Sequence, residues 1–199
     1  FKKNNYQLNI LYIIRRYVDR SNEMYNDLDH YIIDKDEIFL PLKRLVKIIK
    51  DNNIDANIII KPHPKNSIFE LENDLRYLHY NNIEISTEPI YKLASNTDLV
   101  LSIHSTILFI PILMGIPTLL INNNLHKKVV GKWPVLNDLY NSLSFFINDK
   151  DEFKSMVINA IEEIKGNKKT SINNDIKHVY SYFTENSISL IFSDLESIN

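Results

Sequence analysis

Two short stretches of the sequence combine groups that bind or protonate phosphate with a backbone that holds them stiffly. In the first, residues 58–64 (Ile-Ile-Ile-Lys-Pro-His-Pro), three isoleucines precede Lys61 and a histidine, His63, between two prolines. A short β-branched run bounded by prolines is typical of a strand buried on both faces, and each proline restricts itself and the residue before it. We therefore expect Lys61 and His63 just beyond the carboxyl end of a strand, where open α/β sheets bind ligands. The alternative is a proline-rich turn whose histidine has no function.

The second stretch, residues 99–106 (Leu-Val-Leu-Ser-Ile-His-Ser-Thr), carries Ser102, Ser105 and Thr106 where a predicted strand turns into a helix. Free N–H groups and the positive end of the helix dipole make such a turn an anion site. The hydroxyls of Ser105 and Thr106 would add hydrogen-bond donors. An ordinary helix cap explains the same pair, so both interpretations stay open. We expect His104 to point into the core.

Arg15 and Arg16 follow the first predicted strand, residues 8–14. If this strand ends beside the other two, the arginines or Lys61 can form charge-assisted hydrogen bonds to phosphate oxygens. The pKa of a histidine lies near neutrality, so His63 could donate a hydrogen bond to a phosphate leaving group or protonate it.

The composition predicts one large domain with a sizeable core, because 44% of the 199 residues are hydrophobic. With a net charge of −2, the chain has no overall positive potential that would attract nucleic acid. The chain has no cysteine, which excludes disulfides and thiolate chemistry and fits a reducing cytoplasm. The chain starts at Phe1, and a strand pattern begins within ten residues. We therefore expect a fragment, or one domain of a longer protein.

Strand and helix patterns alternate along the chain. Two Asp-Lys-Asp-Glu tetrapeptides, at residues 34–37 and 149–152, precede helical patterns, and helix capping explains both better than metal binding does. Ser67 with Glu70 is a further predicted cap, and Gly115 is expected to end a helix in the left-handed conformation. The predicted strands are residues 8–14, 57–61, 83–85, 98–102, 117–121 and 143–147, and the predicted helices are 34–51, 67–78, 89–95, 106–114 and 149–164, with a short helix or irregular excursion at 21–31.

Repeated strand–helix alternation predicts an α/β fold, a doubly wound, Rossmann-like parallel sheet of about six strands in the order 3-2-1-4-5-6. Residues 1–165 would form this domain and residues 166–199 a helical carboxyl-terminal extension. The ends of the first, second and fourth strands would then be neighbours. This order predicts that one crevice collects Arg15, Arg16, Lys61, His63, Ser102, Ser105 and Thr106.

The motifs of other enzyme classes are missing. Arg15, Arg16 and Tyr17 stand where a dinucleotide-binding fold has its glycine-rich turn, and a chain with three glycines has no P-loop. Neither H-E-x-x-H nor G-x-S-x-G occurs. Of the functions considered, this leaves recognition of a phosphate group without a dinucleotide or a metal, and we expect no cofactor.

Over residues 8–164 the sequence resembles the carboxyl-terminal half of GT-B glycosyltransferases. The resemblance rests on K-P-H-P after a strand, D-L-V-L-S-I-H-S-T, and I-L-M-G-I-P-T-L-L. Within that fold it is most similar to bacterial surface-polysaccharide enzymes, namely sialyl- and polysialyltransferases, capsule Kdo transferases and polyglycerol-phosphate polymerases. These families typically use CMP- or CDP-activated donors.

The resemblance implies a role for each matching residue. His63 would contact the donor phosphate and assist departure of the nucleotide, and Ser105 and Thr106 would bind phosphate. Glu88, the nearest acidic residue before the fourth strand, would hold the ribose or base. The chain departs from the pattern at residues 110–111, Ile-Pro, where many GT-B enzymes have a glutamate. The general base would come from an amino-terminal domain that this chain does not show.

The implied activity is metal-independent, inverting transfer of a sugar or sugar-like group from a CMP- or CDP-activated donor to a glycan acceptor of capsule or lipopolysaccharide. The expected location is the cytoplasm or the inner face of the membrane, with any membrane contact made by regions outside this chain. Two alternatives remain: an enzyme resembling UDP-N-acetylglucosamine 2-epimerase, whose Gly-Gly loop is absent here after the fourth strand, and a non-catalytic Rossmann-like binding module.

Overall fold

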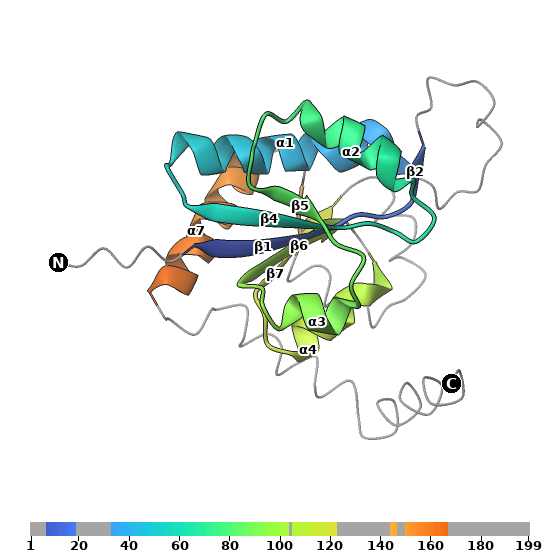
Figure 1. The fold of residues 1–199 in the computed structure, drawn as a ribbon. Helices are drawn as coiled ribbons and strands as arrows, with labels where there is room; N and C mark the ends of the chain where they lie inside the picture. The colour runs from blue at the N-terminus through green and yellow to red at the C-terminus, as the bar shows by residue number, and fades with distance from the viewer. Residues whose placement is uncertain (1–6, 19–32, 104, 123–143, 147–149, 167–199) are drawn as a thin grey trace, which may run out of the picture.

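A parallel sheet lies between two layers of helices in the computed structural model, which describes residues 7–18, 33–103, 105–122, 144–146 and 150–166. Helices α1, α2 and α7 cover one face of the sheet, and α3 and α4 cover the other (Figure 1). The predicted excursion at 21–31, His104 and the predicted extension beyond residue 166 lie outside the described residues. The helices are α1 (Lys35–Asp51), α2 (Ile68–Arg76), α3 (Ile90–Ala94), α4 (Phe109–Leu113) and α7 (Lys150–Lys165).

The strand order confirms the predicted doubly wound α/β fold. Five strands lie in the order β5-β4-β1-β6-β7, which is the predicted 3-2-1-4-5, and all of them are parallel. The three residues of β8 pair in parallel with β7 at the edge of the sheet. A separate two-stranded parallel sheet joins β2 and β3. The strands are β1 (Leu8–Ile13), β2 (Tyr17–Val18), β3 (Ile33–Asp34), β4 (Ala56–Lys61), β5 (Ile83–Ile85), β6 (Leu99–Ile103), β7 (Thr118–Asn122) and β8 (Ser144–Phe146).

Strand β1 is apolar almost throughout because both faces of the sheet are covered. Ile10 and Tyr12 belong to the core beneath α1, α2 and α7, whereas Leu11 and Ile13 belong to the core beneath α3 and α4. All four side chains are at most 3% exposed. The central strand therefore joins the two cores of the domain.

Two of the predicted helix caps are present. An oxygen of the Asp34 carboxylate accepts a hydrogen bond from the backbone N–H of Asp36 at 3.0 Å, at the start of α1. The hydroxyl of Ser67 accepts one from the N–H of Glu70 at 3.3 Å, at the start of α2. Each satisfies a donor that has no partner within its helix. Asp149, the predicted cap of α7, lies outside the described residues.

The prediction of a single helix at residues 106–114 is wrong in detail. A three-residue 3₁₀ turn, η2 (Thr106–Leu108), comes first, and α4 then has only five residues. Pro111 has no N–H, so the carbonyl four residues earlier cannot accept an α-helical hydrogen bond, which fits a tighter turn there. Gly115 has a φ of +74° after the helix, as predicted for its left-handed end.

The hydroxyl of Tyr12 joins the central strand to the helix layer. Tyr12 is fully buried, and its hydroxyl donates a 2.8 Å hydrogen bond to the carbonyl oxygen of Ile38 in α1. Burial raises the pKa of this hydroxyl far above its ordinary value, so the proton stays in place.

We expect Tyr12→Phe to lower the free energy of unfolding by about 1 kcal/mol, because it removes one buried hydrogen bond and little volume. Urea denaturation followed by circular dichroism measures this. Tyr77→Phe is the matched control, since Tyr77 is 77% exposed and its replacement should change nothing. Equal unfolding free energies for the two variants would show that the Tyr12 hydroxyl contributes no stability.

Candidate functional site

Strand pairing brings the ends of three strands together at the carboxyl edge of the sheet. Ile13 of β1 pairs with Lys61 of β4 on one side and with Ser102 of β6 on the other. One step further, the N–H of Ile14 donates to the carbonyl oxygen of Lys61 at 3.0 Å. The segments after β1, β4 and β6 therefore leave the sheet side by side, as the predicted strand order requires.

The segment after β4 is a tight turn that is tied to the chain leaving β1. The carbonyl oxygen of His63 accepts from the N–H of Asn66 at 2.9 Å, with Pro64 at the second position of the turn, where its fixed φ is favoured. The side-chain amide of Asn66 donates to the carbonyl oxygen of Arg15 at 3.0 Å. Sequence analysis did not single out Asn66, although an asparagine closing a proline turn is a recognisable signal.

The imidazole of His63 is partly buried and has a defined orientation. Its Nδ1 accepts a hydrogen bond from the backbone N–H of Lys65 at 3.1 Å. Neutral imidazole carries one proton, which must therefore lie on Nε2, the nitrogen available as a donor. Burial lowers the pKa of His63, and the positive charges of Arg15, Lys65 and Arg16 lower it further. The geometry and the charges together favour a neutral imidazole that donates from Nε2.

Tyr17 anchors the segment that carries the two arginines. Arg15 and Arg16 are both partly buried. The ring of Tyr17 meets that of Phe39 edge-to-face, with 5.5 Å between centroids, and its hydroxyl donates to the carboxylate of Asp74 at 3.2 Å. The chain after β1 is thus held against α1 and α2. Tyr17 had no predicted role, and no pattern in the sequence pairs it with Asp74, 57 residues away.

Lys61 and Glu88 lie on the β5 side of the site. The ammonium group of Lys61 donates to the carbonyl oxygen of Thr87 at 2.9 Å. Burial lowers the pKa of Lys61, and the negative charge of Glu88 opposes that shift. Glu88 itself is exposed and pairs with Lys92 at 3.3 Å. Lys61 therefore joins the segment after β5 to β4, next to Glu88.

The candidate hydroxyls after β6 have different environments. Ser102 is fully buried, and its hydroxyl oxygen lies 3.0 Å from the carbonyl oxygen of Ile13 and 2.6 Å from that of Ile103. It stabilises the sheet edge from within and does not reach the surface. Ser105 is partly exposed, and its carbonyl oxygen accepts from the N–H of Leu108 at 3.2 Å to begin η2. Ser105 therefore remains a candidate for binding phosphate.

The structure leaves a smaller helix dipole at Ser105 than the sequence predicts. The helical structure that follows is a 3₁₀ turn and a five-residue helix, and few aligned peptide groups give a weak dipole. The positive charge at this edge comes chiefly from side chains, namely Arg15, Arg16, Lys61 and Lys65. Of the two predicted sources of positive charge, the structure thus favours the side chains over the helix dipole.

Neither models of protein families nor curated protein sequences match this chain. Within the described residues, no group of three or more histidine, aspartate or glutamate side chains could hold a metal ion. None of the helices in that part of the chain is both long and apolar enough to cross a lipid bilayer.

We expect the pKa of His63 to lie below 6.5 when measured by NMR titration of the imidazole resonances. Arg15→Gln should raise this pKa, because it removes a nearby positive charge, whereas Lys47→Gln on α1 should leave it unchanged. Since the unfolded chain then binds protons more readily than the folded one, stability should fall as the pH drops below about 6.5. That fall should be smaller in His63→Gln. A pKa at or above 6.5 would contradict the charge environment described here.

Proposed function

We propose that this chain is the donor-nucleotide-binding half of a metal-independent GT-B glycosyltransferase. The donor would be CMP- or CDP-activated, and the product a bacterial surface polysaccharide. One observation carries the proposal: the His63 imidazole, oriented by the hydrogen bond from the N–H of Lys65 to its Nδ1, lies close enough to Arg15 and Arg16 for their charges to lower its pKa. The motif resemblance described above adds the class of donor to this geometry.

The chemistry of such a site centres on the phosphate that leaves with the nucleotide. Negative charge grows on this phosphate as the bond to the sugar breaks, so donors already in place stabilise the transition state more than the ground state. The Nε2–H of His63 would donate to a phosphate oxygen, and the arginines would add charge-assisted hydrogen bonds. Ser105 and Thr106 would complete the phosphate contacts, and Glu88 would hold the ribose or base.

The lowered pKa of His63 favours one of its two possible roles, that of hydrogen-bond donor, over that of proton donor. A histidine that is neutral at pH 7 acts as a hydrogen-bond donor more readily than as a reservoir of protons. The arginines lower the pKa and also attract the phosphate, so the bound phosphate would raise the pKa of His63 by its own charge. Binding of the donor would therefore prepare the histidine to transfer a proton late in the reaction.

Other parts of the proposed enzyme would supply the remaining functions. The general base and the glycan acceptor site would belong to an amino-terminal domain, and membrane contact would be made by regions outside this chain. The proposed location is the cytoplasm or the inner face of the membrane.

We expect isothermal titration calorimetry of the chain against CMP, CDP, UMP and UDP, in EDTA, to detect tighter binding of the cytidine nucleotides. Arg15→Gln should weaken binding about tenfold or more, because it removes a charge-assisted contact to phosphate. Arg76→Gln on the exposed surface of α2 is the matched control and should bind as the unmodified chain does. Tighter uridine binding would favour the epimerase-like alternative, and no binding of any nucleotide would overturn the proposal.

A second prediction concerns turnover in the full-length enzyme. His63→Ala should lower turnover by about 10²- to 10⁴-fold and donor affinity much less, because the contact strengthens as the leaving group gains charge. Pro62→Ala keeps the imidazole and loosens the loop, so its effect should be smaller. Single-turnover kinetics with a CMP-activated donor separates the two quantities. Equal losses in affinity and in overall catalytic efficiency, with turnover unchanged, would make His63 a binding residue only.

A further inference from the structure

The segment that carries Arg15 and Arg16 is held at both of its ends. At one end, the N–H of Ile14 donates to the carbonyl oxygen of Lys61 at 3.0 Å. At the other end, Tyr17 belongs to β2, which pairs in parallel with β3. Only the two arginines lie between these points, so they must take up any shift of Tyr17.

Asp74 of α2 binds the hydroxyl of Tyr17 from outside this segment. One oxygen of its carboxylate accepts the 3.2 Å hydrogen bond from Tyr17, and the other forms an ion pair with the ammonium group of Lys35 at the start of α1. The side chain of Asp74 is 11% exposed, so both contacts are largely shielded from water. One carboxylate thus joins β2, α1 and α2.

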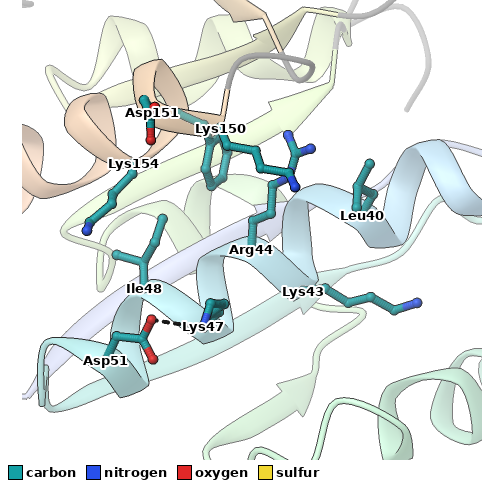
Figure 2. Close-up of a pocket in the computed structure, with 10 residues that line it drawn as sticks. Leu40, Lys43, Arg44, Lys47, Ile48, Asp51, Lys150, Asp151 and Lys154 are labelled. Atoms are coloured by element: carbon teal, nitrogen blue, oxygen red, sulfur yellow. Dashed lines mark ion pairs between the residues drawn. The ribbon is translucent and has the colours of Figure 1, made fainter.

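The ion pair between Lys47 and Asp51 is an ordinary surface contact by comparison. Its side chains are 76% and 55% exposed, and both belong to α1, beside the pocket between α1 and α7 (Figure 2). Exposed pairs within one helix contribute little to stability. The contacts of Asp74 are more buried and join separate elements, so their loss would change how those elements lie relative to one another.

The contact between the rings of Tyr17 and Phe39 does not by itself fix the tyrosine. Edge-to-face pairs form at centroid distances of about 4.5–7 Å, and this pair, at 5.5 Å, could slide within that range. A hydrogen bond is more restrictive, since it is lost once its two heavy atoms separate beyond about 3.5 Å. The bond to Asp74 therefore removes freedom that the ring contact leaves.

We propose that Asp74 is a positioning residue of the candidate nucleotide site. Through its bond to Tyr17, it holds the two arginines close to His63. Charged groups that are in place before a ligand arrives bind it more tightly, because less conformational entropy is lost on binding. This consequence for binding rests on the proposed function, whereas the position of the arginines can be measured in the free chain.

The pKa of His63 reports how close the arginines lie, because their charges lower it. We expect Tyr17→Phe, which removes one hydroxyl and changes no charge, to raise this pKa towards 6.5 in NMR titrations of the imidazole. The rise should be smaller than in Arg15→Gln, because Asn66 still binds the carbonyl of Arg15. An unchanged pKa in Tyr17→Phe would overturn the proposal.

Asp74→Asn and Asp74→Leu separate the effect of position from that of charge. Both lose the negative charge and keep roughly the size of the side chain, but only Asp74→Asn retains an acceptor for the hydroxyl of Tyr17. We expect a higher pKa of His63 in Asp74→Leu than in Asp74→Asn. Equal values would show that the hydrogen bond does not position the arginines, contrary to the proposal.

Tyr80→Phe is the matched control for the loss of a tyrosine hydroxyl. Tyr80 donates a 2.6 Å hydrogen bond to the carbonyl oxygen of Ala56, at the opposite end of β4 from Lys61. We expect Tyr80→Phe to lower the melting temperature about as much as Tyr17→Phe does and to leave the pKa of His63 unchanged. A pKa shift of the same size in both variants would reflect a general loss of stability and would overturn the proposal.

Calorimetry with CDP tests the consequence for binding. We expect Tyr17→Phe and Asp74→Leu each to weaken CDP binding about threefold to tenfold, the loss caused when a side chain must be ordered on binding, and Asp74→Asn to weaken it less. Binding that is weakened in Arg15→Gln but unchanged in Tyr17→Phe and Asp74→Leu would overturn the positioning role alone. Absence of CDP binding by the unmodified chain would overturn the proposed function alone, because the NMR comparison needs no nucleotide.

Discussion

The parallel pairing of β1 with β4 on one side and β6 on the other is the constraint on which the rest of the structure depends. It aligns Ile13 with Lys61 and with Ser102, so three chain segments leave the sheet at one place. A shift by one residue would exchange the faces of β1, moving Tyr12 away from its partner in α1. Burial on both faces makes such a shift costly, and the positions of the site residues follow from this register.

The carboxyl edge is stabilised mainly by side chains that bind main-chain carbonyl groups. Asn66 binds the carbonyl of Arg15, Lys61 that of Thr87, and Ser102 that of Ile13. Each bond joins two segments that leave different strands, so the edge behaves as one unit. Burial of His63 lowers its pKa, and the positive charges of Arg15, Lys65 and Arg16 lower it further.

Helix α1 contributes to two regions with different character. Its buried side, with Leu42, Leu45 and Ile49, packs on the sheet, while Arg44 and Leu40 face the pocket towards α7. Pro41 lies within the helix and removes one of its hydrogen bonds. The helix continues through Pro41 because tertiary packing, rather than intrinsic propensity, supplies most of its stability. One side of α1 is thus part of the core, and another faces α7.

The sequence by itself determined the α/β class, the order of the first five strands, two of the helix caps and the meeting of the strand ends at one edge. These depend on short-range patterns: apolar runs, polar caps and the right-handed crossover. It also predicted the stiff presentation of His63, because two prolines act locally.

Only the tertiary structure decided which candidates can reach a ligand and which support the fold. Ser102 and Ser105 are three residues apart and look alike in sequence, yet one is fully buried and the other is partly exposed. The hydrogen bond from Tyr17 to Asp74 and the effect of the Arg15 and Arg16 charges on the pKa of His63 likewise depend on residues far apart in the chain. The burial and the charge environment of a residue depend on all its neighbours in space, whereas a sequence pattern contains only its neighbours along the chain.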